Sequence, residues 1–261
     1  MDIKYKFIAV EDSNDGTLCL VLNRPEKRNA FHGEMLDEML HFLQLSPGNQ
    51  RVLILRGNGP IFCGGGDIDW MHAICHSSEE IRFKEAHRIR QLFHSIHTYP
   101  IPTIAVVHGG AYGGGVGLAA ACDFVVGDEN ALFSTSEVRL GIVPACLAPY
   151  LVRRVGFSTA RQLFLTGERL RSSDACALGL VDIVESAGTT SNLDELLSKL
   201  RIGSPNAQRD SKSLLLSLEQ FGDVDASTIE FLANSWGSMD GREGTQAFTQ
   251  KRIPKWESKE Y

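Results

Sequence analysis

Two runs of three glycines, at residues 64–66 and 113–115, stand out in this chain of 261 residues. Each run follows an apolar, strand-like segment, although glycine inside regular structure costs about 0.5–1 kcal/mol relative to alanine. A residue without Cβ lets a ligand approach the backbone N–H closely, and two N–H groups from two loops can bind one developing oxyanion. The runs therefore predict either tight turns or a pair of backbone donors for an oxygen that gains negative charge.

Nucleotide binding is a third use of glycine clusters, and this sequence fits it poorly. The segment GGAYGG can be aligned with GxGxxG from Gly109, but no suitable early βαβ unit precedes it. The segment GGGVG lacks the Lys-Ser/Thr pair of a phosphate-binding loop. Dinucleotide binding is therefore not favoured.

The segments that must position these glycines alternate between strand and helix patterns. We expect strands at 17–23, 51–57 and 101–109, and helices at 30–45, 79–98, 158–168 and 172–179. Segment 131–145 predicts a further strand, which carries Glu137 and Arg139 on one face, and then a turn. Alternation continues to about residue 190 and helix-favouring sequence follows, which predicts an α/β core with a helical C-terminal segment.

Composition excludes several classes of protein. Hydrophobic residues make up 43% and charged residues 22%, which is typical of a globular protein, and the net charge of −6 gives no nucleic-acid footprint. No apolar run reaches the roughly 18 residues of a membrane helix, and the N-terminus lacks a signal-peptide pattern, so we expect a cytoplasmic location. The six cysteines form no CxxC pair and are expected to be reduced, mostly buried thiols, and no metal-ligand spacing is found.

Five segments in register resemble the enoyl-CoA hydratase/isomerase (crotonase) superfamily over nearly the whole chain. They are LNRPEKRNAF, FCGGGDIDWM, HGGAYGGGVGLAAACD, FSTSEVRLGIVPA and REGTQAFTQKRIPKW. The resemblance implies an α/β, ClpP/crotonase-like ββα spiral core over residues 1–200 and a helical C-terminal trimerisation segment over 201–261. It also implies an acyl-CoA thioester substrate, a homo-oligomer (trimer or dimer of trimers), no metal, and no cofactor beyond the coenzyme A of the substrate.

The same resemblance assigns the catalytic groups. Gly66 and Gly114 would donate the two oxyanion N–H groups to the thioester carbonyl, and Glu137 matches the later of the two glutamates of the hydratases. Gly117 stands where the earlier glutamate falls, so the chain departs from the two-glutamate form. A single carboxyl can serve as both base and acid if apolar surroundings raise its pKa.

Further substrate contacts follow from the matched segments. Arg139 could pair with a second carboxylate on the acyl group or form a structural ion pair. The residues expected to contact coenzyme A are Lys27, Arg28, Ala30, Phe248 and Lys251. The other residues expected at the substrate are Gly64, Asp67, Ile68, Trp70 and Gly117.

The predicted activity is hydration of a short branched 2-enoyl-CoA. The segments around Gly117 and Glu137 most resemble bacterial methylglutaconyl-CoA hydratases of leucine catabolism, which makes 3-methylglutaconyl-CoA a candidate substrate. A Δ3,Δ2-enoyl-CoA isomerase with one glutamate, a non-catalytic acyl-CoA-binding homologue and a decarboxylase remain open alternatives.

Overall fold

The computed structural model describes residues 4–254 apart from 14, 219–228, 230–231 and 235. Its strands form a six-stranded sheet of order β1-β2-β3-β4-β6-β9, parallel except between β1 and β2, and a three-stranded sheet of order β5-β7-β8. The strands of the larger sheet are β1 (Ile8–Asp12), β2 (Thr17–Leu22), β3 (Val52–Gly57), β4 (Thr103–Val107), β6 (Phe124–Asp128) and β9 (Ile183–Glu185). Those of the smaller sheet are β5 (Gly110–Tyr112), β7 (Leu132–Ser134) and β8 (Leu170–Arg171).

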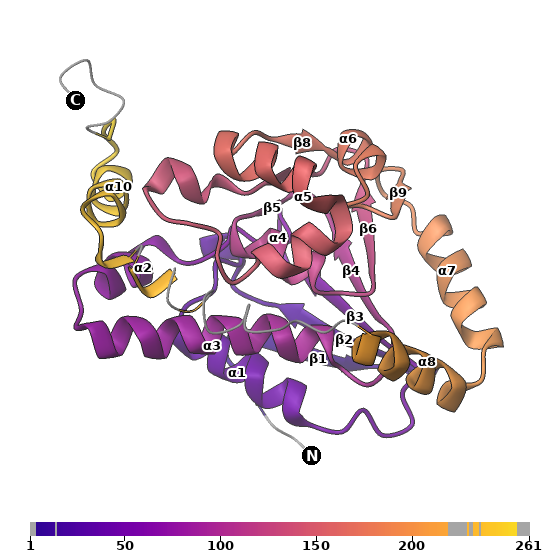
Figure 1. The fold of residues 1–261 in the computed structure, drawn as a ribbon. Coiled ribbons are helices and arrows are strands. Elements are labelled where there is room, and N and C mark those ends of the chain that lie inside the picture. The colour runs from indigo at the N-terminus through magenta and orange to yellow at the C-terminus, as the bar shows by residue number, and fades with distance from the viewer. Residues whose placement is uncertain (1–3, 14, 219–228, 230–231, 235, 255–261) are drawn as a thin grey trace.

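Helices surround the sheets and confirm the α/β class (Figure 1). The α-helices in the first half of the chain are α1 (Gly33–Gln44), α2 (Ile68–Cys75), α3 (Glu79–His97) and α4 (Gly114–Ala120). Those in the second half are α5 (Ala148–Thr166), α6 (Ser172–Ala177), α7 (Ser191–Ile202), α8 (Pro205–Leu218) and α10 (Met239–Thr249). Two 3-10 helices, η1 (Pro25–Lys27) and η2 (Ser136–Leu140), precede α1 and α5.

The central strands β3, β4 and β6 of the larger sheet are mostly buried, which fits their apolar sequences. Leu53, Leu55 and Ala105 belong to one core cluster with the apolar residues of α1 and α3. Val52 and Ile54, which alternate with them along β3, pack on the opposite side in a cluster that includes residues of α7. The helix predicted at 30–45 is confirmed as α1, and the apolar residues whose helical spacing predicts it are all buried. These residues are Met35, Leu36, Met39, Leu40 and Leu43.

Three sequence-based expectations need correction. The helix predicted at 158–168 begins at Ala148, since Pro149 is tolerated in a first helical turn, and Gly156 interrupts it with φ 73°. The helical spacing of apolar residues in 79–98 places Ile81 on the same side as Ile89 and Phe93, but in α3 Ile81 is exposed. The strand predicted to carry Glu137 ends at Ser134, and Glu137 lies on the 3-10 helix η2.

The C-terminal part of the chain contacts the core at two places. Lys212 of α8 pairs with Asp123 at 2.6 Å and donates to the Ile101 carbonyl. Helix α10 lies against η2, where a methyl group at Gly244 would overlap the Leu140 carbonyl at 1.9 Å, and beside α2 (Figure 1). The proposed boundary between residues 200 and 201 falls inside α7 and stays a prediction.

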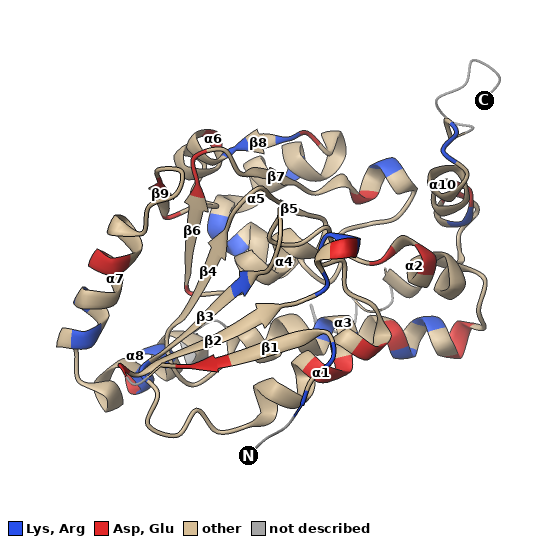
Figure 2. Cartoon of the chain, turned by 180° about the vertical axis from the view of Figure 1, so that it is seen from behind, with Lys and Arg blue, Asp and Glu red and all other residues tan. Residues whose placement is uncertain are grey.

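Charged residues are arranged differently on different helices. Figure 2 shows acidic and basic residues interspersed along α3, whereas α1 carries acidic residues and no Lys or Arg, and the acidic residues of α7 precede its basic ones. None of the helices that the structure describes is long and apolar enough to cross a membrane. The cytoplasmic location stays a prediction.

Candidate active site

Backbone pairing brings the two glycine runs together. Cys63 N–H donates to the Gly110 carbonyl at 3.2 Å, and Tyr112 N–H donates to the Cys63 carbonyl at 3.0 Å, so the first loop runs alongside β5. Gly65 has φ +92°, and a methyl group there would lie 2.6 Å from the Tyr112 carbonyl oxygen and 3.5 Å from Gly114 N. Glycine is therefore required at residue 65 both by backbone conformation and by the close approach of the second loop.

Gly66 and Gly114 present two available backbone donors to one cleft. Both residues line it, and neither N–H donates a hydrogen bond to another described residue. Gly114 is the first residue of α4, where N–H groups have no partner inside the helix. Such a pair can bind a single oxygen atom that acquires negative charge.

Asp67 fixes the loop that ends in Gly66. Its carboxylate caps α2 by accepting from Asp69 N–H and Trp70 N–H, and it pairs with Arg24 at 2.6 Å in a nearly buried setting. Burial opposes ionisation, but the hydrogen bonds from Arg24 and the helix N–H groups outweigh it and hold the pKa of Asp67 below its usual value. Asp67 lines the cleft as predicted, yet its carboxylate is engaged inside the protein.

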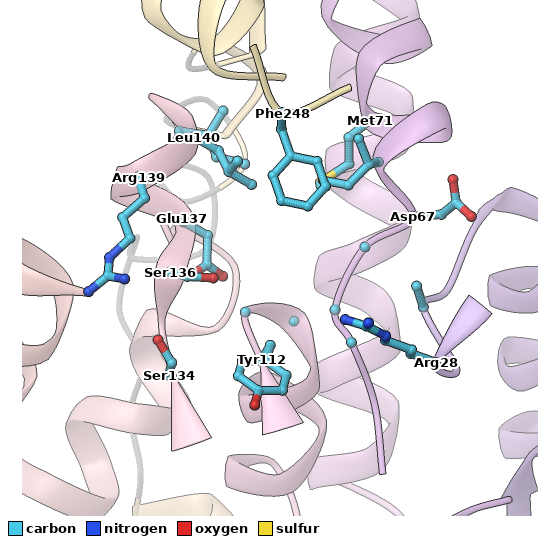
Figure 3. Close-up of a pocket in the computed structure, with 18 of the residues that line it drawn as sticks. Arg28, Asp67, Met71, Tyr112, Ser134, Ser136, Glu137, Arg139, Leu140 and Phe248 are labelled. Carbon is cyan, nitrogen blue, oxygen red and sulfur yellow. The ribbon is translucent and has the colours of Figure 1, made fainter. Parts of the chain in front are cut away.

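Glu137 supplies a carboxyl beside these donors. The residue is half-buried, but its Oε2 is fully buried and has no hydrogen-bond partner among the described residues. Burial raises the pKa of Glu137 to about 7, against a small opposing effect of its own backbone N–H. Figure 3 shows this carboxyl directed toward the cleft, with Phe248 and Met71 on the opposite wall. A carboxyl that titrates near neutrality can both accept and return a proton.

The cleft has an outer and an inner part. The outer part, of about 700 Å³, opens among loops that bring several cations to it. Lys27 pairs with Asp69 and Arg252 with Glu243, whereas Arg28 and Arg169 have no carboxylate within ion-pair distance among the described residues. These two guanidinium groups are suited to phosphate groups.

The inner part is a small, mainly apolar pocket of about 60 Å³. Gly66, Gly114 and Glu137 line both parts, so the donors and the carboxyl lie at the junction between them. The apolar residues of the inner pocket include Phe31, Trp70, Met71, Ile89, Phe93, Ile142, Leu147, Leu232 and Trp236. A ligand carbonyl at the junction would thus place its polar end in the outer part and its apolar end in the inner pocket.

Most of the predicted site residues line this cleft. Trp70 is found in the inner pocket. Those in the outer part are Lys27, Arg28, Ala30, Gly64, Gly66, Asp67, Ile68, Gly114, Glu137, Arg139 and Phe248.

Two predicted residues lie elsewhere. Lys251 is an exposed residue after α10 that lines neither part, and Arg252 lines the outer cleft instead. Gly117 is buried inside α4, and a methyl group there would lie 2.7 Å from Phe93 Cζ and 2.8 Å from Leu147 Cβ. The space that the earlier glutamate would need is thus filled by apolar side chains.

The orientation expected for Arg139 is wrong. On a strand, residues two apart point to one face, but η2 has about three residues per turn. The Arg139 guanidinium therefore turns away from the Glu137 carboxyl (Figure 3) and reaches the Thr166 carbonyl at 3.4 Å. It still lines the outer cleft.

Several lining residues were not predicted from the sequence. Tyr112 directly precedes the second glycine run and could have been proposed for that reason. Arg169 and Trp236 lie outside the matched segments and come to the cleft through tertiary packing. Among the residues that the structure describes, no group of three His, Cys, Asp or Glu side chains could hold a metal ion.

Fold and cleft together define an α/β protein with a site suited to thioester chemistry. The sequence model of the family "Enoyl-CoA hydratase/isomerase" matches residues 12–259. A protein of Thermus thermophilus, named as a candidate enoyl-CoA hydratase, is 38% identical over 90% of this chain and 95% of its own length. A Mycosarcoma maydis protein named enoyl-CoA isomerase/hydratase is 35% identical, with 92% of each chain covered.

Solved structures agree with this match. An enoyl-CoA hydratase of Mycobacterium avium subsp. paratuberculosis superposes with a TM-score of 0.83 at 28% identity, covering 96% of this chain and 98% of the other. The chain belongs to the enoyl-CoA hydratase/isomerase family and has the crotonase fold. It is an enzyme of that family.

Proposed function

We propose that this enzyme is an enoyl-CoA hydratase that adds water to a short, branched 2-enoyl-CoA. The observation that carries the proposal is the buried Glu137 carboxyl, which lines the same cleft as the available N–H groups of Gly66 and Gly114. The cations of the outer cleft, Arg28 and Arg169 above all, would bind the phosphates of coenzyme A.

The proposed reaction uses one carboxyl for both proton transfers. The thioester oxygen accepts hydrogen bonds from Gly66 and Gly114, and each donor is worth about 3 kcal/mol as negative charge develops. Ionised Glu137 takes a proton from water while the water oxygen bonds to C3, and the π electrons of the C2–C3 double bond move into the thioester enolate. Glu137 then returns the proton to C2, which completes the addition of water.

The inner pocket favours a short, uncharged acyl group. It is small, and its described lining contains no Lys, Arg or His. The distal carboxylate of 3-methylglutaconyl-CoA would therefore have to reach Arg139 or Arg169 in the outer cleft. That substrate, and with it a place in leucine catabolism, remains a candidate to be tested beside shorter enoyl-CoAs.

A Δ3,Δ2-enoyl-CoA isomerase is the second candidate. It is favoured by the packing at Gly117, where Phe93 and Leu147 leave no room for a second glutamate. An isomerase needs only one carboxyl to move a proton between C2 and C4. A non-catalytic acyl-CoA-binding protein or a decarboxylase would instead leave 2-enoyl and 3-enoyl thioesters unchanged.

A substrate panel tests these activities with the purified protein. Crotonyl-CoA, 3-methylcrotonyl-CoA and 3-methylglutaconyl-CoA report hydration through loss of the conjugated enoyl absorbance, and a 3-enoyl-CoA reports isomerisation through its gain. We expect hydration of a branched 2-enoyl-CoA to be fastest. Turnover of the 3-enoyl-CoA without hydration would establish the isomerase. Binding without any turnover would contradict both activities and leave the non-catalytic homologue and the decarboxylase.

We further propose that the chain forms a trimer or a dimer of trimers through its C-terminal segment. Met239 and Phe248 of α10 and the following Ile253 are exposed apolar side chains. In the segment SLLLSLEQF, Leu215 is also exposed, whereas residues 219–221 lie outside the described residues. Light scattering at micromolar concentration should give a trimeric or hexameric mass, and a monomer would contradict the proposal.

A further inference from the structure

Two residues that line the same inner pocket each carry a buried polar atom without a partner. One is Oε2 of Glu137, and the other is the indole nitrogen Nε1 of Trp236, a residue that is only 1% exposed. The other described residues of the pocket are apolar or glycine, apart from Cys146, whose thiol is directed to the Ala86 carbonyl at 3.6 Å. The residues around this pocket therefore include one unpaired hydrogen-bond donor, the Trp236 indole N–H, and one unpaired acceptor, Glu137 Oε2.

An unpaired indole N–H at this depth calls for an acceptor. Buried tryptophan N–H groups usually have a hydrogen-bond partner, and leaving such a donor unpaired is destabilising. Trp236 Nε1 has no acceptor in the described part of the chain, which leaves this donor available to a water or ligand oxygen in the pocket that the residue lines. A water molecule needs about 10–15 Å³ and two to four polar partners, and this pocket offers the room and two partners.

We propose that Trp236 is a positioning residue for hydration, whose indole N–H donates to the oxygen of the water that Glu137 deprotonates. The inference rests on the proposed hydratase activity. The water oxygen would accept from Trp236 and donate one hydrogen to Glu137, which leaves a lone pair free to bond to C3. After addition, the same N–H holds that oxygen as the 3-hydroxyl group of the product.

This arrangement explains how one carboxyl can suffice. An indole N–H does not release its proton in this range of pH, so it orients the water while every proton transfer stays with Glu137. The second glutamate has no space, since Phe93 and Leu147 occupy the position beyond Gly117. Trp236 would thus supply the orientation of the water without a second titrating group.

The test separates attack by water from proton transfer at C2. Trp236→Phe removes the N–H, and replacement of Trp236 by benzothienylalanine removes it while keeping the bicyclic shape. Both variants are compared with the wild type in the hydration of the best substrate of the panel. They are also compared in the exchange of the C2 protons of butyryl-CoA with D₂O, a reaction that needs Glu137 and the backbone donors but no attacking water.

We expect the kcat for hydration to fall about tenfold or more in both variants, with KM and the rate of proton exchange nearly unchanged. Trp70→Phe is the matched control, because Trp70 lines the same pocket but is only half-buried and its N–H is not a buried unpaired donor. In the Trp70→Phe variant, the ratio of the hydration rate to the proton-exchange rate should stay at the wild-type value.

Three outcomes would overturn the inference. If hydration is unchanged in both Trp236 variants, the indole N–H has no part in the reaction. If hydration and exchange fall together, Trp236 only supports the shape of the pocket. If the wild-type protein exchanges C2 protons but hydrates no enoyl-CoA, the proposed hydratase activity fails, and the positioning role fails with it.

Discussion

The carboxyl group of Glu137 lies against the backbone of Gly113, where a methyl group would be 3.1 Å from Glu137 Oε1. Gly113 directly precedes the donor Gly114, and its N–H donates to the Ser134 carbonyl at 2.8 Å, at the end of the strand that leads into η2. The pairing of β5 with β7 therefore fixes the carboxyl relative to the second glycine loop. This relationship underlies the predictions that follow.

Replacement of Glu137 by glutamine should stop both proton transfers. Glu137→Gln keeps the size of the side chain but removes the titrating group, so hydration should fall by about 10²–10⁴-fold. Exchange of C2 protons with D₂O should be lost in parallel if one carboxyl performs both steps. Affinity for a saturated acyl-CoA, measured by calorimetry, should change little because the donors at Gly66 and Gly114 are backbone groups. Near-full activity would show that another acid or base acts.

The raised pKa of Glu137 predicts a rise of activity with pH. Only the ionised carboxyl can deprotonate water, so kcat/KM for hydration should increase through an apparent pKa of about 7 and then level off. A profile measured with crotonyl-CoA checks this. An apparent pKa near the ordinary value of 4.5 would show that the carboxyl is solvated in the working enzyme.

The same shift predicts how stability depends on pH. Below the ordinary pKa of 4.5 the carboxyl is protonated in both the folded and the unfolded chain, so its contribution is fully present. Between pH 4.5 and the folded value of about 7 the unfolded chain ionises while the buried carboxyl keeps its proton, so the contribution is lost as the pH rises through this window. The free energy of unfolding, taken relative to Glu137→Gln by urea titration, should fall by about 3 kcal/mol over this window. If the difference in unfolding free energy between the wild type and Glu137→Gln does not change with pH, the Glu137 carboxyl is not buried as described.

Two substitutions of Gly66 distinguish the contribution of its N–H group to activity from the contribution of its small size. Gly66→Pro removes the donor and should lower turnover by about a hundredfold or more. Gly66→Ala keeps the N–H, and its methyl group would meet only the flexible end of Met71, at 2.9 Å from Sδ. The alanine variant should therefore retain most of the activity that the proline variant loses. Equal activities in folded variants would mean that residue 66 serves only as a turn.

A glutamate restored at residue 117 should not rescue a two-carboxyl mechanism. Gly117→Glu drives a side chain into Phe93 and Leu147, and overpacking a core typically costs about 1–3 kcal/mol before the buried charge is counted. We expect a lower melting temperature and no gain in hydration of crotonyl-CoA. The double variant Gly117→Glu/Phe93→Ala, which creates room, should regain part of the lost stability. If Gly117→Glu alone hydrates crotonyl-CoA faster than the wild type and keeps its melting temperature, the space beside Phe93 can hold a glutamate side chain.

The sequence by itself determined the α/β class, the helix α1 and the residues at the centre of the cleft. Helical spacing of apolar residues identifies α1 because burial on one face is a local, periodic requirement. Gly66, Gly114 and Glu137 could be selected because the glycine runs and the five matched segments keep a fixed order along the chain. These are properties of neighbouring residues, and they need no knowledge of long-range packing.

Only the tertiary structure decided which side chains face one another. The 3-10 turn that carries Glu137 replaced the predicted strand and turned Arg139 away from it. Packing of Phe93 against α4 closed the space at Gly117, and the C-terminal segment brought Trp236 into the pocket of Glu137. Distances between residues about a hundred positions apart are set by the packing of whole elements, a dependence that local patterns of a single sequence do not encode.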